Sequence, residues 1–156
     1  MFNEGGVFFM GMDINLRFEY RDKNGKWKQF PVYTKEGNKY VYAHPDMGRD
    51  YNLFNALKDF SRGGIPKDSS KEVQEEYEEY NGFDAGSATY GTLHYAAHEF
   101  PHNKIWDDEG NVVCTVISPY KEILNLLDAY IALSTNLFFD TEDKVSGTRV
   151  VFWFDN

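Results

Sequence analysis

Apolar and polar positions alternate over residues 10–20, which predicts a β-strand. The two alternating sets are Ile14, Leu16, Phe18 and Tyr20, and Asp13, Asn15, Arg17 and Glu19. A period of two places one set in a core and the other on the opposite face of the strand. The polar set holds two acids, an amide and a guanidinium. This face is therefore either the floor of a polar site or a solvated strand with mixed charges.

Turn signals and apolar runs predict further strands around this first one. Asn24-Gly25 is a strong hairpin signal. A second strand is expected over residues 27–33, at a sheet edge because Pro31 has no N–H for a ladder. A short third strand, residues 40–42, completes an N-terminal meander.

The second half of the chain predicts another hairpin and a central strand. Residues 105–108 and 112–117 flank the turn at residues 109–111. Residues 148–154 are almost continuously apolar, as is typical of a strand that is covered on both faces. We expect this strand to pair with residues 10–20.

Apolar stripes preceded by capping residues predict helices. The expected helices are residues 51–60 after Asp50, an acidic and exposed helix at 71–80 after Asp68, Ser69 or Ser70, and one beginning at Ser118-Pro119. Proline suits the first helical position, and serine can cap it. Together these elements predict the α+β class, a mainly antiparallel sheet with its N-terminal and C-terminal strands paired centrally and helices packed on it.

Two glycine-rich segments, residues 62–66 and 81–87, are expected to be loops. Long ordered loops in a small domain are often functional. A short strand at residues 88–90 and a helix capped by Thr92 are expected to follow.

Length and composition indicate one globular domain. The chain has 156 residues, 42% of them hydrophobic and 17% aromatic, and a net charge of −9. This charge argues against binding duplex nucleic acid. Cys114 is the single cysteine, and no segment has the length and apolarity of a membrane span. Residues 1–9 read as a leader from a misassigned start, because Glu-Gly-Gly is what a ribosome-binding site would encode. We therefore expect the native domain to be residues 10–156.

Five short segments share a pattern with one known family. Their matching residues are Gly11, Asp13, Ile14 and Glu19; Arg49, Tyr51, Leu53 and Phe54; Arg62, Gly63, Pro66, Asp68, Ser70 and Val73; Asp84, Ser87 and Tyr90; and Arg149 with Val151–Asn156. In order, they resemble a widespread family of small, mostly uncharacterised bacteriophage proteins that opens Met-Gly-Cys-Asp-Ile-His and ends Val-Phe-Trp-Phe-Asp-Asn. Met12, Asn15 and Gly86 replace that family's cysteine and two histidines. A metal or acid–base role is therefore not carried over to these positions.

The matched segments contain the residue types of a nucleotide pocket. Arginine suits bidentate recognition of phosphate, aromatic faces can stack on bases, and acids and amides can bind hydroxyl and amino groups. The candidate ligand-binding residues are Asp13, Asn15, Arg17, Glu19, Arg49, Tyr51, Asn52, Arg62, Asp84, Ser87, Tyr90 and Arg149. The alternative is that each arginine pairs with a nearby acid and each aromatic is core, as we expect for Tyr51, Trp153 and Phe154.

The sequence gives no case for a catalytic residue, a bound metal or a cofactor. His94 and His98 have the spacing of helical metal ligands, but HExxH is absent, and a solvated helix face is the expected reading. Ser87 lacks the partners of a nucleophile and is interpreted as a loop or capping hydroxyl.

Three classes of function remain open. The first is a phage anti-defence protein that sequesters a small nucleotide-derived immune signal, cyclic or of the ADP-ribose type, in the cytoplasm of the infected bacterial host. The second is an acidic protein that inhibits a host defence protein, as a nucleic-acid mimic or in the manner of an anti-CRISPR protein. The third is a nucleotide-degrading enzyme. No membrane partner is expected. A homo-oligomer is expected, because a shared pocket buries more of a small ligand.

Overall fold

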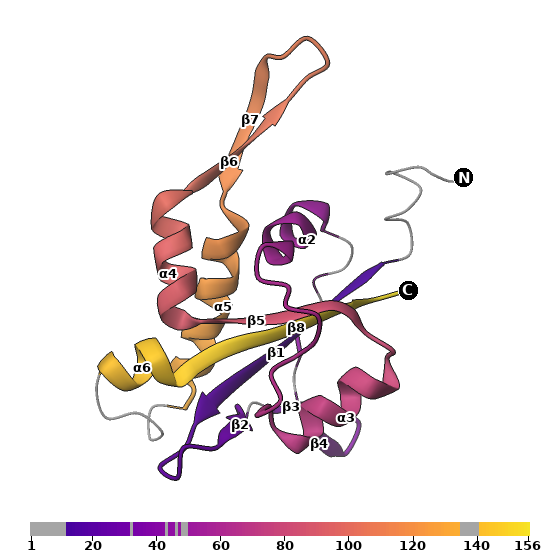
Figure 1. Ribbon diagram of the computed structural model, residues 1–156, viewed down its shortest axis with the longest axis vertical. Coiled ribbons are helices and arrows are strands. Elements are labelled where there is room, and N and C mark those ends of the chain that lie inside the picture. The colour runs from indigo at the N-terminus through magenta and orange to yellow at the C-terminus, as the bar shows by residue number, and fades with distance from the viewer. Residues whose placement is uncertain (1–11, 32, 43, 46, 48–49, 135–140) are drawn as a thin grey trace.

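A four-stranded antiparallel sheet organises the molecule. The computed structural model describes residues 12–31, 33–42, 44–45, 47, 50–134 and 141–156 (Figure 1). The strand order is β2 (Trp27–Gln29), β1 (Asp13–Arg21), β8 (Thr148–Asp155) and β5 (Phe83–Thr89). The predicted α+β class and the central pairing of the first and last strands are both confirmed.

The pairing of β1 with β8 sorts the side chains of both strands onto two faces. Their register runs from Asp13 opposite Asp155 to Tyr20 opposite Thr148. Because side chains alternate along a strand, one face is apolar. Its buried side chains are Ile14, Leu16, Phe18, Val150, Phe152 and Phe154.

Three helices cover the apolar face. They are α2 (Tyr51–Lys58), α4 (Tyr90–Glu99) and α5 (Pro119–Ala132). Their fully buried leucine and isoleucine side chains join the main core: Leu53, Leu57, Leu93, Ile123 and Leu127. Burial of an aliphatic side chain of this size is worth about 1.5–3 kcal/mol, so this face supplies most of the hydrophobic stabilisation.

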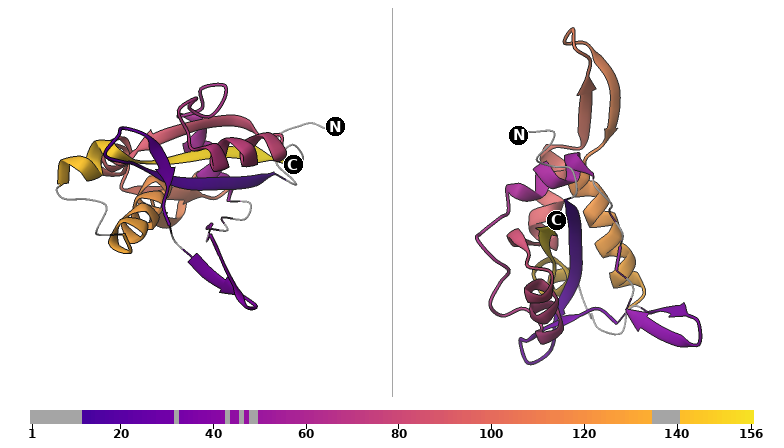
Figure 2. Two further views of the ribbon diagram at one scale, coloured as in Figure 1. Left: turned by 90° about the horizontal axis from the view of Figure 1, so that it is seen from below. Right: turned by 90° about the vertical axis from the view of Figure 1, so that its right-hand side faces the viewer.

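The opposite face of the sheet is covered by α3 (Lys71–Glu79), which lies across β1 from α5 (Figure 2). Val73 of α3 is buried against Val151 and Trp153, and Tyr77 packs on the same cluster. The prediction of an exposed α3 is therefore wrong for one side of the helix. Val73 and Tyr77 stand four residues apart and form a narrow apolar stripe within an otherwise acidic sequence.

Two further hairpins lie outside the main sheet. One pairs β3 (Tyr33–Glu36) with β4 (Lys39–Tyr42), and the other pairs β6 (His102–Trp106) with β7 (Val112–Ile117). The strand predicted over residues 27–33 is thus divided between β2 and β3. The helix α6 (Thr141–Gly147) was not predicted.

Residues 83–89 form the edge strand β5, although residues 81–87 were predicted to be a loop. Gly86 lets the backbone of β5 lie close to the backbone of Phe60, because a Cβ at this position would collide with the Phe60 carbonyl oxygen. A Cβ at Gly82 would lie 2.6 Å from the Trp153 ring. Because β5 reaches Thr89, the side chain of Thr89, and not that of Thr92, caps α4.

The predicted caps are confirmed at two helices and not at the third. Asp50 and Ser70 accept hydrogen bonds from the backbone N–H groups of Leu53 and Val73. The helix at Ser118-Pro119 begins where predicted, but the Ser118 hydroxyl makes no capping hydrogen bond. It is buried and has no hydrogen-bond partner among the described residues. The Ser118 backbone carbonyl accepts from the backbone N–H groups of Lys121 and Glu122 instead.

Residues 1–9, which we interpret as a leader, lie outside the described residues, and so does Met10. Within the described part of the chain, no helix has the length and apolarity needed to cross a membrane.

Candidate functional site

The polar face of β1 contains a buried ion pair between Glu19 and Arg149. Oε1 of Glu19 accepts from Nε of Arg149 at 2.9 Å and lies 2.8 Å from Nη2. The other carboxylate oxygen accepts from the backbone N–H of Ser70 at 2.8 Å. Arg149 also contacts Asp68 at 3.1 Å and lies over the Trp27 ring, 3.8 Å from its centroid. Both buried charges are therefore compensated within the protein.

Arg17 is held in a similar way next to this pair. Its side chain is only 5% exposed, and its Nη2 lies 2.8 Å from a carboxylate oxygen of Glu76 on α3. Its Nη1 donates to the carbonyl of Leu16, and the guanidinium lies 5.0 Å from the Trp153 ring centroid. Arg17 and Arg149 thus pair with acids from the segment around α3, Glu76 and Asp68, and Arg149 also pairs with Glu19 of β1.

Other predicted site residues lie farther along the sheet or at its ends. The side-chain amide of Asn15 donates to Asp155 at 2.6 Å, and Asp13 is exposed at the start of β1. Tyr51 was expected in the core but is 44% exposed on α2. Arg49 lies outside the described residues.

The glycine-rich segments bring two predicted residues together. Arg62 and Ser87 line a small cleft of about 260 Å³ beside Lys67. Arg62 donates to the carbonyls of Asp59 and Ser61, at 3.1 and 2.7 Å. The Asp84 carbonyl accepts from the Ser61 hydroxyl at 2.7 Å, so this contact ties the two segments together.

Tyr90 stands apart, buried at the start of α4. Its ring stacks on the His94 ring at a centroid distance of 6.3 Å. The Lys144 ammonium lies over the Tyr90 ring, with Nζ 4.5 Å from the ring centroid. Burial raises the pKa of the Tyr90 hydroxyl. The twelve predicted residues therefore do not line one common cavity among the described residues.

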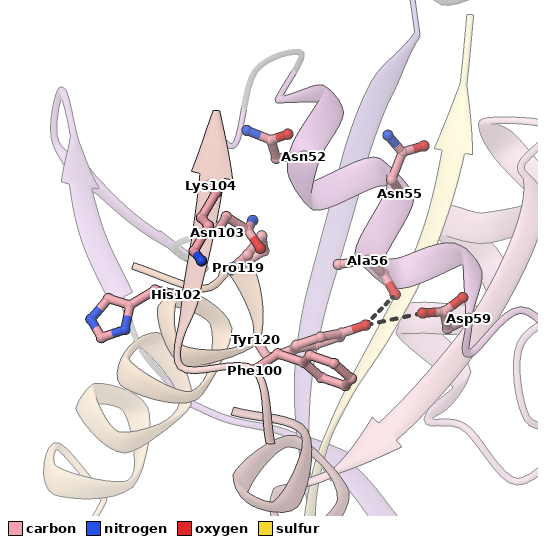
Figure 3. Close-up of a pocket in the computed structure, with 10 residues that line it drawn as sticks. All are labelled: Asn52, Asn55, Ala56, Asp59, Phe100, His102, Asn103, Lys104, Pro119 and Tyr120. Atoms are coloured by element: carbon pink, nitrogen blue, oxygen red, sulfur yellow. Dashed lines mark hydrogen bonds between the residues drawn. The ribbon is translucent and has the colours of Figure 1, made fainter. Parts of the chain in front are cut away.

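A larger cleft of about 410 Å³ lies between α2, the start of β6 and the start of α5 (Figure 3). We call it the α2–β6 cleft. It is lined by Asn52, Asn55, Ala56, Asp59, Phe100, His102, Asn103, Lys104, Pro119 and Tyr120. In Figure 3, Asn52 and Asn55 lie across the cleft from Asn103 and Lys104. Of the predicted residues that the structure describes, only Asn52 belongs to this cleft.

Tyr120 and Asp59 form the fixed end of the α2–β6 cleft. The phenol donates to Oδ2 of Asp59 at 3.1 Å and approaches the Ala56 carbonyl at 3.4 Å. The pKa of Tyr120 is raised to about 12, mainly by burial. The hydrogen bond to Asp59 and the negative charge of Asp59 also raise it. The hydroxyl therefore remains a protonated hydrogen-bond donor at neutral pH. Phe60 packs edge-on against the Tyr120 ring.

The rest of the lining is open and chemically mixed. Phe100 is 61% exposed, which leaves an aromatic surface available. Three amides, Asn52, Asn55 and Asn103, provide both donors and acceptors. Lys104 adds a cation beside them. Such a lining can stack on a flat ring, hydrogen-bond to its edge and pair with an anion.

Sequence reasoning missed most of this cleft, although one signal was available. Asn52 and Asn55 stand three residues apart within an amphipathic helix whose apolar stripe includes Leu53 and Leu57. Residues at i and i+3 share a helix face. A helix with two amides side by side opposite its core stripe is a candidate ligand surface.

The histidines and acids of the described residues are not arranged as a metal site. No group of three or more His, Cys, Asp or Glu side chains in that part of the chain could hold a metal ion. His94 and His98 are exposed on α4, as the interpretation of a solvated helix face requires.

Comparison with known proteins gives no relative for this chain. No protein-family model, no curated protein and no solved structure matches it.

Proposed function

We propose that the protein binds a small nucleotide-derived molecule in the α2–β6 cleft and holds it without converting it. The carrying observation is that amides from two elements, an exposed ring and a lysine line the same cleft of about 410 Å³. Ligand pockets commonly have volumes of roughly 300–1,000 Å³. A base with one or two phosphates is within the capacity of this cleft.

Each group in the cleft has a part in this proposal. The base stacks on Phe100, since aromatic rings accept any base face at about 1–3 kcal/mol per stack. The amides of Asn52 and Asn103 hydrogen-bond to the base edge. Lys104 pairs with phosphate. Asp59, already held by Tyr120, can accept from a ribose hydroxyl.

In this proposal the Tyr120 hydroxyl is a hydrogen-bond donor at the fixed end of the cleft, because burial and the neighbouring Asp59 raise its pKa to about 12. The resemblance of five segments to bacteriophage proteins supports an anti-defence role, in which the bound molecule is an immune signal of the infected host. The protein would then act in the host cytoplasm.

Calorimetric titration tests this proposal directly. The panel contains cyclic dinucleotides, cyclic mononucleotides, ADP-ribose derivatives and the corresponding nucleosides. We expect one class to bind, and Lys104→Ala to lower its affinity at least tenfold. Lys39→Ala, which removes an exposed lysine on β4, should keep wild-type affinity. If no member of the panel binds, or if Lys104→Ala binds as tightly as the wild type, the proposal is wrong.

A second candidate, inhibition of a host protein by an acidic surface, is favoured by the outer side of α3. Glu75, Glu78 and Glu79 are exposed there, while Glu76 is paired with Arg17. Reversing the three exposed charges to lysine would abolish binding of a basic protein target. The same reversal would leave nucleotide binding in the α2–β6 cleft unchanged.

A further inference from the structure

The hairpin of β6 and β7 projects from the body of the protein (Figure 1), and several of its apolar side chains are exposed. Five apolar side chains of the hairpin are between 40% and 61% exposed: Ile105, Trp106, Val112, Val113 and Ile117. An isolated two-stranded hairpin is marginally stable in water. Large exposed apolar surface often marks an interaction site.

The outer edges of the two strands differ in chemistry. β7 runs Val112–Ile117 without a charged residue, a proline or a glycine. β6 carries His102 and Lys104. Natural sheets protect a free edge with charge, lysine above all, and an uncharged apolar edge is prone to pair with another strand. The edge of β7 is the unprotected one.

We propose that β7 pairs antiparallel with β7 of a second copy of this chain, which joins two hairpins into a four-stranded sheet across a two-fold axis. The strand is self-complementary, because β-branched and small side chains face each other from both copies. The hairpin extends away from the sheet and helices of its own copy (Figure 2).

Charge at the hairpin tip selects the antiparallel arrangement. Asp107, Asp108 and Glu109 form the turn. A parallel arrangement would bring the two acidic tips together, whereas the antiparallel one sends them to opposite ends. Each tip then lies toward the base of the other hairpin, where His102 and Lys104 are found. Attraction between an acidic tip and Lys104 favours this arrangement, and it weakens beyond a Debye length of about 8–10 Å.

The charges on β6 also explain why association stops at two copies. Pairing of β7 with β7 leaves β6 as the new outer edge, and Lys104 protects it. The interface is isologous and closed, so it produces a dimer and not a filament.

The exposed apolar area sets the expected strength. Pairing through β7 covers the three exposed apolar side chains of that strand, Val112, Val113 and Ile117, and leaves Ile105 and Trp106 of β6 outside the contact. A standard stable interface buries about 800 Å² per partner. The dimer is therefore weak, with a Kd in the micromolar range.

Sedimentation equilibrium under reducing conditions tests the association. The wild type should convert from monomer to dimer as its concentration rises through the micromolar range. Cys114→Lys places two like charges near the two-fold axis and should weaken the dimer at least tenfold. Ile105→Lys is the matched control, because Ile105 lies directly opposite Cys114 on β6, and it should change the Kd less than threefold. A wild type that stays monomeric to millimolar concentration, or equal effects of the two substitutions, would overturn the proposal.

Cysteine cross-linking tests which edge pairs and does not depend on the lysine variants. Opposed residues on antiparallel strands have Cα atoms about 4.5–5.5 Å apart, within the usual disulfide range of roughly 4.4–6.8 Å. Mild oxidation should give a covalent dimer from the native Cys114 or, if the axis passes through the next residue, from Cys114→Ser/Thr115→Cys. Cys114→Ser/Ile105→Cys should remain monomeric on denaturing gels. Cross-linking at residue 105, or at none of the three positions, contradicts pairing through β7.

Discussion

Replacing Glu19 with glutamine measures how far the polar face of β1 stabilises the fold. Glu19 is fully buried, and its carboxylate faces two Arg149 nitrogens and the Ser70 backbone N–H. Glutamine can still accept one of these hydrogen bonds. Its amide nitrogen, however, would face a donor, and the guanidinium would lose its buried counter-charge.

The expected cost follows from burial. Removing one partner of a buried ion pair costs about 3–5 kcal/mol. The contact of Arg149 with Asp68 remains and offsets part of this loss, so we expect about 3 kcal/mol for Glu19→Gln. Asp68 is 66% exposed, and an exposed pair is worth about 0–1 kcal/mol. Asp68→Asn is therefore the matched control and should cost less than about 1 kcal/mol.

Urea unfolding followed by far-ultraviolet circular dichroism gives the free energies, provided the slopes agree between variants. The difference between the variants is the critical quantity. A cost below about 1 kcal/mol for Glu19→Gln, or equal costs for the two variants, would refute a structural role of the buried pair. The face of β1 would then be better explained as a ligand site whose charges are not needed for folding.

Two further predictions concern close packing and titration. Gly86→Ala should lower the free energy of unfolding by about 2–3 kcal/mol in the same assay, because a Cβ there meets the Phe60 carbonyl oxygen. Gly64→Ala is the control and should change it by less than about 1 kcal/mol, because the nearest atom to its Cβ would be 3.8 Å away. Similar losses for the two variants would contradict the close approach at Gly86. The folded-state pKa of Tyr120 is about 12, above its ordinary value of 10.0, so the stability it contributes is complete below pH 10 and is lost as pH rises toward 12. Wild-type stability should therefore fall more steeply over this range than that of Tyr120→Phe, and parallel curves would show that Asp59 and burial do not hold the proton.

The central strands could be predicted from sequence because their signals are local. The alternation in β1 predicts a strand with one apolar and one polar face, and the continuous apolar run of β8 predicts a strand that is covered on both faces. The structure pairs these two strands at the centre of the sheet. The two faces of β1 were also predicted correctly as apolar and polar.

The cover of the polar face could not be predicted in the same way. Glu19 is bound by Ser70, 51 residues away, and by Arg149, 130 residues away. The residue types are equally compatible with a pocket and with internal ion pairs. The path of the chain between α2 and β5 places α3 on this face, and this long-range placement is what makes the charges internal ion pairs.

Glycine caused the clearest error in the predicted elements. Glycine-rich sequence is typical of loops, but Gly82 and Gly86 make room for the Trp153 ring and the Phe60 carbonyl oxygen. A glycine that forms a loop and a glycine that makes room for a neighbouring group give the same local composition. The α2–β6 cleft was missed for a related reason, because Asn52, Lys104 and Tyr120 come from three separate elements.

The most direct measurement is recovery of a ligand from the folded protein. Purified protein is incubated with extracts that contain nucleotide immune signals, washed, denatured by heat and analysed by mass spectrometry for released small molecules. We predict an intact nucleotide, close to one per chain, that is absent from Lys104→Ala and present in Lys39→Ala. Release of degraded nucleotide would indicate an enzyme. Release of nothing, or equal release from a folded Lys104→Ala variant, would contradict sequestration in the α2–β6 cleft.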